Sequence, residues 1–301
     1  MNDRRHLGAA GFVACWILLT LSGCSAQELE ARDFVSVLTV PDGDTESLLA
    51  ERQRTSTCTL DYSHTKAVIL DTTLTQNPEQ LDNVLETLLS RLLDQPIEVA
   101  ASGRTDAGTH AKRQVVSFRA KTELSTQEIL DGLRRYLPAD IGAVSLEQVE
   151  PRFHARFSCT GKTYTYRIWN SDEPNVFERN YLYHLHETLD VPAMRRAAED
   201  LCGTHDYKAF CSLKRTKKST VRRVDCITIQ ELGPELLFTF EGNGFLYHMV
   251  RILVGTLLEV GRGNLRPEEM GDILVSQDRK RAGETVPACG LCLVDVRYEK
   301  S

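Results

Sequence analysis

The feature that most limits how this chain can fold is the segment 101–118, which reads ASGRTDAGTHAKRQVVSF. Gly103 and Gly108 flank a single carboxylate, Asp106, and glycine tolerates backbone angles that other residues avoid. An apolar run typical of a β-strand follows. The segment therefore predicts a tight turn at the mouth of a sheet, with Asp106 held outward and Arg104 close enough to keep it ionised. Taken alone, an ordinary hairpin loop capped by Asp is the alternative.

The residues around this turn predict an α+β half-domain at 57–150. Apolar residues recur at i, i+3 and i+4 in a helix that starts at Pro78 and ends before Pro96. A second helix opens with Ser125 and Glu128, which are spaced as a capping box. The elements expected here are strands within 58–71, at 97–100 and at 115–118, and helices over 78–93 and 125–137.

A second half, 151–301, repeats this order loosely, without a residue-level repeat. Tyrosines and an isoleucine alternate with polar residues over 163–169, which is a strand signature. The most apolar helix is expected over 245–260, with a glycine stop at its end. Further helices are expected over 192–201 and 267–275, and further strands over 224–230, 236–241 and up to 298.

The charge pattern bears on nucleic-acid binding. A formal net charge of −6 argues against affinity over the whole surface, but phosphate contacts depend on local clusters of Lys and Arg. Residues 104–121 carry five basic side chains and one acid, and residues 208–223 carry seven basic side chains and no acid. These runs are either solvated loops or parts of a basic groove. The substrate-binding candidates in the second run are Lys214, Arg215, Lys217 and Lys218.

The nine cysteines are scattered and odd in number, unlike a disulfide framework. Cys289 and Cys292 form a single CxxC, which needs a partner pair to make a zinc site. We interpret both as packing or exposed residues of a strand. The sequence thus implies no metal, and it has no phosphate-cradling loop for a small-molecule cofactor.

The first 24 residues are similar to a bacterial lipoprotein signal. Arg4 and Arg5 precede a short apolar run and a cleavage-box pattern that ends in Cys24. The apolar run is too short for a comfortable membrane span. Export with membrane anchoring, a start codon placed too far upstream and a rearranged 5′ end are the alternatives, and we favour the last two. Residues 25–56 are polar and are expected to be a linker or tail.

The turn resembles the GRTDAG active-site motif of the tRNA pseudouridine synthase A family. The resemblance continues, in the family's order, through four further blocks. It departs from the family before residue 78, because the aromatic and glycine residues of the family's Y-D-G-T-x-F-x-G-W-Q phrase are missing from 60–66. The four further blocks are FHARFSCTGKTYTYRIWN (153–170), GTHDYKAF (203–210), GNGFLYHMVRILVGTLLEVGRG (242–263) and AGETVPACGLCLVDVRY (282–298).

This resemblance implies the pseudouridine synthase fold, with two α+β halves whose antiparallel sheets are flanked by helices around an active-site cleft. It implies cofactor-free isomerisation of uridine to pseudouridine at positions 38, 39 or 40 of the tRNA anticodon stem, by a cytoplasmic homodimer. A base within a stem must be flipped out before such chemistry. Recognition should rest on shape and phosphates, because the A-form major groove is too narrow to read.

The resemblance also implies roles for particular residues. Asp106 is the expected nucleophile, since an ionised carboxylate can attack carbon without a cofactor. Arg251 lies in an apolar run, where burial without a partner is costly, so it either faces solvent or pairs with Asp106. Tyr164 is either a core residue or stacks on the target base and takes part in proton transfer at C5. Arg104 would assist Asp106 or contact a phosphate or the flipped base, and His110 would contact RNA.

Two functions of other classes remain open from the sequence. A catalytically impaired RNA-binding relative would fit the atypical region before residue 78, and an exported lipoprotein could reuse the fold for binding. A glycosidase built on paired carboxylates fits poorly, because the segment 101–118 that carries Asp106 holds no second acid. His154, Arg156, His205 and His248 are weaker site candidates.

Overall fold

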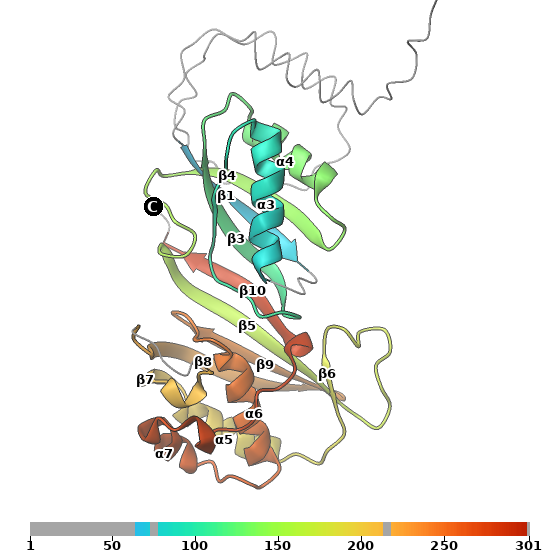
Figure 1. Cartoon of the computed structure of the whole chain (residues 1–301). Coiled ribbons are helices and arrows are strands. Elements are labelled where there is room, and N and C mark those ends of the chain that lie inside the picture. The colour runs from blue at the N-terminus through green and yellow to red at the C-terminus, as the bar shows by residue number, and fades with distance from the viewer. Residues whose placement is uncertain (1–63, 73–77, 213–217, 300–301) are drawn as a thin grey trace, which may run out of the picture.

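The computed structural model describes residues 64–72, 78–212 and 218–299 of the 301-residue chain. A single ten-stranded sheet runs through both halves, in the order β4-β1-β3-β10-β5-β9-β8-β7, with β2 beside β3 and β6 beside β5 (Figure 1). The expectations for residues 1–24 and 25–56, and for the first strand before residue 64, fall outside the described residues. None of the described helices is long and apolar enough to cross a membrane.

The first half forms around two helices that pack on its strands. In α4 the Ser125 side chain accepts from the backbone N–H of Glu128, and the Glu128 carboxylate accepts from the N–H of Ser125, so the predicted capping box is confirmed. The leucine stripe of α3 also packs as predicted, with Leu85 and Leu89 fully buried. The elements are β1 (His64–Thr72), α3 (Pro78–Leu93), β2 (Val99–Ala101), β3 (His110–Ala120), α4 (Thr126–Tyr136) and β4 (Ile141–Val149).

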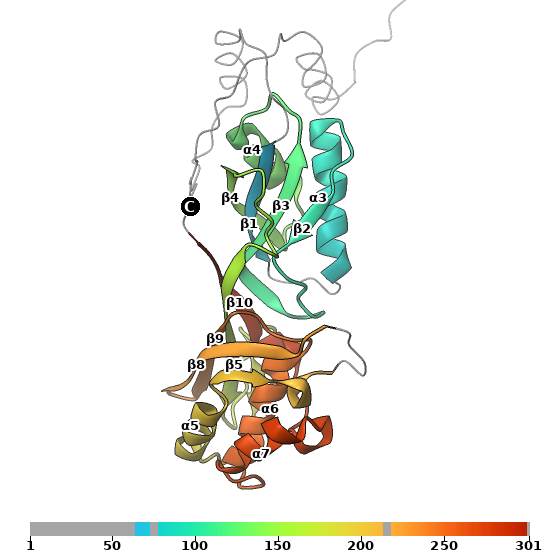
Figure 2. The ribbon, with the colours of Figure 1, turned by 90° about the vertical axis from the view of Figure 1, so that its left-hand side faces the viewer.

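The second half has its own buried cluster, in which α6 is covered on nearly all sides. Figure 2 shows α5, α6 and α7 gathered at the end of the molecule opposite α3 and α4. The elements are β5 (Cys159–Asn170), β6 (Tyr183–Leu185), α5 (Val191–Asp200), β7 (Gly203–Asp206), η1 (Lys208–Phe210), β8 (Val221–Leu232), β9 (Glu235–Gly242), α6 (Met249–Gly261), α7 (Glu269–Ser276), η2 (Arg279–Arg281), η3 (Ala288–Gly290) and β10 (Leu291–Tyr298).

The start of α6 corrects one sequence expectation. The helix was expected from residue 245, but it begins at Met249, because His248 adopts a left-handed backbone conformation with φ of 62°. Non-glycine residues rarely adopt this region, and a helix cannot continue through it. The apolar run 245–248 is therefore a turn that leads into the helix.

Strand β10 joins the two halves. It pairs in parallel with β3, where Cys292 lies opposite His110, and antiparallel with β5, where Leu291 lies opposite Tyr166. The α+β class of the two halves is confirmed, but they share one sheet, and two of its pairings, β10 with β3 and β5 with β6, are parallel. The last strand of the chain thus fixes the first half against the second.

A close backbone crossing sets the position of α6. A Cβ added to Gly255 would lie 1.9 Å from the carbonyl oxygen of Glu284, and one added to Gly283 would lie 2.5 Å from the carbonyl carbon of Gly255. The N–H of Gly283 donates to Oγ1 of Thr256 at 2.9 Å. Because only glycine permits this approach, the segment after Gly283 lies directly against the helix.

Candidate active site

Asp106 lies in the turn between β2 and β3, as the sequence predicts. The N–H of Thr109 donates to the carbonyl of Asp106 at 3.0 Å, and Gly108 has a φ of 79°, which glycine adopts without strain. The start of the turn is held by Gln114, whose amide donates to the carbonyl of Gly103 at 2.9 Å. The Asp106 side chain is 16% exposed, so it is sheltered yet accessible.

Arg251 meets Asp106 from the other half of the molecule. Its Nη1 donates to Oδ2 of Asp106 at 3.1 Å, although the residues are 145 positions apart in sequence. Its Nε donates to the carbonyl of Val286 at 2.7 Å, so the guanidinium is held at two points. Of the two alternatives predicted for Arg251, the structure has the pair with Asp106. The guanidinium compensates the sheltered carboxylate charge.

His248 is a second partner of Asp106. Its Nε2 lies 3.4 Å from Oδ2 of Asp106, and its Nδ1 lies 3.0 Å from Oγ of Ser212. Burial lowers the pKa of His248, the Asp106 carboxylate raises it, and the charges of Arg251 and Arg279 lower it further. The sequence interpretation ranked His248 among weaker candidates. The available signal was its position in the same sequence block as Arg251, three residues before it.

Tyr164 is both a buried residue and part of the cleft wall. It lies on β5, is 8% exposed, and its ring meets Phe245 edge to face with centroids 5.4 Å apart. Burial raises the pKa of its phenol, and the nearby charge of Asp106 raises it further. The hydroxyl therefore keeps its proton through the neutral pH range.

Lys162 was not singled out from the sequence. Its Nζ donates to the carbonyl of Ser102 at 2.8 Å, directly beside Gly103, where an added Cβ would lie 2.5 Å from Nζ. Burial lowers the pKa of Lys162, while Cys159 raises it and Arg156 lowers it. The signal that could have identified it is the K-x-Y spacing, because residues i and i+2 of a strand lie on the same face.

These residues line a cleft with a volume of about 930 Å³. Its described lining includes two acids, Asp82 and Asp106, and an exposed aromatic ring, Tyr247. The excess of positive charge favours a polyanionic ligand. No group of His, Cys, Asp and Glu within the described ranges could hold a metal ion. The basic side chains that line the cleft are Arg104, Arg156, Lys162, Lys218, Arg222 and Arg251.

Arg104 does not take the position expected for it. Its side chain is exposed at the cleft, and between these two described residues there is no hydrogen bond or ion pair from Arg104 to Asp106. Arg104 therefore makes no direct contact with Asp106, and Arg251 is the cation in contact. Lys218 is exposed and lines the cleft, as expected for a phosphate contact. The other three basic candidates, Lys214, Arg215 and Lys217, lie outside the described residues.

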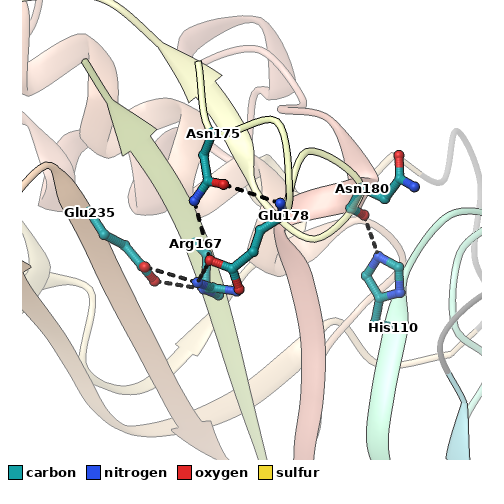
Figure 3. A network of polar contacts seen from close by, with 6 residues as sticks. All are labelled: His110, Arg167, Asn175, Glu178, Asn180 and Glu235. Atoms are coloured by element: carbon teal, nitrogen blue, oxygen red, sulfur yellow. Dashed lines mark hydrogen bonds and ion pairs between the residues drawn. The ribbon is translucent and has the colours of Figure 1, made fainter. Parts of the chain in front are cut away.

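His110, expected to contact RNA, lies away from the cleft lining. It is 5% exposed, its Nε2 is 2.8 Å from the carbonyl oxygen of Asn180, and its ring centroid is 4.8 Å from that of Tyr181 (Figure 3). The loop that carries Asn180 is held by Arg167, which pairs with both Glu178 and Glu235 (Figure 3). His110 thus ties this loop to the start of β3, and its ring is not available to a ligand in the cleft.

The chain is similar in sequence to known proteins. The profile of the tRNA pseudouridine synthase family matches residues 197–299. The chain is 45% identical to a tRNA pseudouridine synthase A of Moorella thermoacetica over 210 residues, which cover 70% of this chain and 85% of that protein. It is 43% identical to a tRNA pseudouridine synthase A of Halalkalibacterium halodurans over 216 residues, 71% of this chain and 82% of the other.

A third relative, tRNA pseudouridine synthase A 2 of Clostridium perfringens, is 42% identical over 214 residues, 71% of this chain and 88% of that protein. Among solved structures, a Cbf5–Nop10–Gar1 complex aligns with 65% of this chain and 45% of that chain, at a TM-score of 0.34 and 14% identity. That structural likeness is too weak to bear on fold or function. The sequence identity, sustained over more than two thirds of this chain and of each relative, shows that the chain belongs to the tRNA pseudouridine synthase A family.

Proposed function

We propose that this protein isomerises uridine to pseudouridine in tRNA and that Asp106 is the nucleophile. The observation that carries the proposal is the pair of Asp106 and Arg251, which forms across the two halves at 3.1 Å inside a cleft rich in basic side chains. The relatives' shared name, tRNA pseudouridine synthase A, supports the same activity.

The proposed reaction needs only a carboxylate nucleophile and a uracil base that is held in position beside it. A carboxylate oxygen of Asp106 attacks the target nucleoside, at the uracil ring or at C1′ of the sugar, and the N1–C1′ bond breaks. The base turns, C5 bonds to C1′, and the bond between Asp106 and the nucleoside breaks, which restores the free carboxylate. C5 then loses its proton and N1 gains one. Nothing is oxidised, reduced or hydrolysed, so the proposal includes no cofactor.

The cleft offers supporting groups for this reaction. Tyr164 stacks on the flipped uracil and takes part in the proton transfer at C5, for which its buried hydroxyl is suited because it stays protonated. Arg104 reaches from the exposed rim to a phosphate or to the displaced base. Lys218, together with Lys214, Arg215 and Lys217 before it in the sequence, contacts the phosphate backbone.

The finer proposals follow from the resemblance of the motifs to the family. The targets are uridines 38, 39 and 40 of the anticodon stem, the active form is a homodimer with tRNA contacting both subunits, and the protein works in the cytoplasm, where tRNA resides. Replacing each target uridine in turn by cytidine tests the first, and sedimentation of the protein with and without tRNA tests the second.

The activity is tested with the full chain and tRNA tritiated at C5 of uracil. Formation of the C5–C1′ bond releases tritium to water, so release by the wild type and its loss in Asp106→Asn is the expected result. Asp131→Asn, on the surface helix α4, is the matched control and should release tritium at the wild-type rate. Release by Asp106→Asn at that rate would exclude Asp106 as nucleophile. A wild type that binds tRNA without release would be a non-catalytic RNA-binding relative.

A further inference from the structure

Two side chains of the second half contact the same oxygen of Asp106. Nη1 of Arg251 lies 3.1 Å and Nε2 of His248 lies 3.4 Å from Oδ2. Among the described residues, no hydrogen bond reaches Oδ1. The carboxylate is therefore held from one side, and its two oxygens are not equivalent.

His248 is fixed in place more firmly than an ordinary surface histidine. Its left-handed backbone, with φ of 62°, is a strained conformation for a non-glycine residue, and such strain persists only where the surroundings enforce it. Its ring lies against that of Tyr247, with centroids 3.7 Å apart and an interplanar angle of 26°. The turn before α6 thus aims the imidazole at Asp106.

The partner of the other ring nitrogen selects the tautomer. When Oγ of Ser212 donates to Nδ1, at 3.0 Å, the neutral ring carries its proton on Nε2, the atom that faces Oδ2 of Asp106. A neutral His248 then presents its N–H toward Oδ2 at 3.4 Å, a polar contact that adds no charge. The imidazole of His248 thus lies between the hydroxyl of Ser212 and the carboxylate of Asp106.

We propose that His248 is a positioning residue for Asp106: with Arg251 it holds Oδ2, and it leaves Oδ1 to attack the substrate. The proposal rests on the proposed function, in which Asp106 is the nucleophile. Protonation of His248 would place a second cation beside the carboxylate and reduce its nucleophilicity. Activity should therefore fall as His248 becomes charged.

The groups that face His248 set the pH at which it becomes charged. Ser212 follows η1, Asp106 comes from the turn, Arg251 lies on α6 and Arg279 lies in η2. Burial lowers the pKa of His248 and so do the two arginines, against the raising effect of Asp106. The pKa of His248 is on balance lowered, so the ring becomes charged only at a lower pH than an ordinary histidine does.

The contact itself is tested without reference to activity, by NMR titration of the His248 ring in the full-length wild type and in Asp106→Asn. The signal is assigned by its absence in His248→Gln. Removing the carboxylate charge should shift the pKa of His248 further down, because that charge raises it, whereas Asp131→Asn should leave it unchanged. An identical pKa in wild type and Asp106→Asn would overturn the contact and the proposal.

The role is tested by the pH profile of tritium release between about pH 5 and 8. In His248→Gln, kcat at pH 7.5 should fall about tenfold, in the range caused by small misplacement of a reacting group, with KM unchanged. The acid limb should also move to lower pH, which a merely structural loss would not produce. His186→Gln is the matched control, because His186 is exposed and paired with Asp172.

Each outcome decides something different. A His248→Gln variant with the wild-type rate and acid limb would overturn the positioning role and leave the proposed function intact. A wild type that releases no tritium at any pH would overturn the proposed function, and with it the role of His248 in it. The NMR titration would still report separately whether the histidine and the carboxylate are in contact.

Discussion

The two walls of the cleft differ in how they are built. The wall from the first half is a turn, and it contributes Asp106 on backbone that is held by other backbone and by Gln114. The wall from the second half combines side chains on regular elements, with Arg251 at the start of α6 and Lys162 and Tyr164 on β5, and the turn before α6 that carries His248. The reactive group is on a loop, whereas Arg251, which pairs with it, is on a helix, and Lys162, which holds its turn, is on a strand.

This difference separates two tasks. A turn can hold a carboxylate out at the end of a sheet, where a substrate can reach it. A helix and a strand that are packed on both sides restrict their side chains more tightly, so they can orient the carboxylate. Because β10 lies between β3 and β5, the sheet itself keeps the two walls in register. Changes in the second wall should therefore affect the reaction more than comparable changes elsewhere in the first half.

The largest effect is expected from Arg251→Met, which removes the cation from Asp106. The carboxylate would remain sheltered without its partner, and the carbonyl of Val286 would lose its donor. We expect kcat/KM to fall by about a thousandfold, the upper range for loss of one electrostatic contact at a reacting group. Tritium release from C5-labelled tRNA measures it.

Arg195→Met is the matched control for this change. Arg195 also donates to a backbone carbonyl, of Ile229, and pairs with a carboxylate, of Glu231, but on the surface of the second half. If both variants lost activity equally, the effect of Arg251 would come from general weakening of the second half and not from the contact with Asp106.

A smaller effect is expected from Gly255→Ala, which disturbs the contact between α6 and the segment after Gly283 that supports the second wall. Alanine normally stabilises a helix by about 1 kcal/mol relative to glycine, but here its Cβ would lie 1.9 Å from the carbonyl oxygen of Glu284. We expect the free energy of unfolding to fall by about 1–3 kcal/mol, as in other overpacked sites. Activity should fall too, because the displaced segment carries the carbonyl of Val286 that holds Arg251.

Gly271→Ala on α7 should change the free energy of unfolding in the opposite direction. Nothing lies within 4 Å of a Cβ at Gly271, so this change should stabilise the protein by up to about 1 kcal/mol. Chemical denaturation of both variants checks the pair. A stabilised Gly255→Ala would show that the two segments are not in close contact.

The local parts of this arrangement could be predicted from the sequence. The leucine period of α3, the capping box of α4 and the turn around Asp106 are set by residues close in the chain, and the structure has all three. The left-handed conformation of His248 could not be predicted, because an apolar pattern does not indicate which single non-glycine residue takes a positive φ. A propensity argument therefore extended the helix through this residue.

The site was predictable only in part, for the same reason. Burial of a charged residue in an apolar run indicates only that it needs a partner, and it was the resemblance to the family that implied Asp106 as the partner of Arg251. Arg104 was expected beside Asp106 because it is close in sequence, yet the observed cation comes from 145 positions away. His110 was expected to contact RNA, but its Nε2 lies 2.8 Å from the carbonyl oxygen of Asn180 and it does not line the cleft.

A still smaller effect is expected from Lys162→Met, which tests how Lys162 of the second wall holds the turn that carries Asp106. The change removes the donor to the carbonyl of Ser102, so the turn that carries Asp106 should move more freely. We expect kcat to fall by about tenfold. Stability should change little, because removing a buried ammonium relieves its desolvation and offsets the lost hydrogen bond.

Thermal unfolding and tritium release, measured together, check this prediction. Lys162→Arg should restore only part of the activity, because the larger guanidinium would meet the backbone beside Gly103. A large loss of stability in Lys162→Met would instead mean that the lysine holds the fold of the strand and not the position of the turn.

The smallest effect is expected from Ser125→Ala, which lies in the first half but outside its cleft wall. The change removes the cap of α4 and should lower the free energy of unfolding by about 1 kcal/mol. Ser125→Asp keeps an acceptor for the N–H of Glu128 and should recover most of that loss. Neither variant should alter kcat, since the first half contributes to the cleft through the turn and not through α4. A fall in kcat for Ser125→Ala at a temperature where it is fully folded would show that the helices of the first half also orient Asp106, and the contrast between the two walls would not hold.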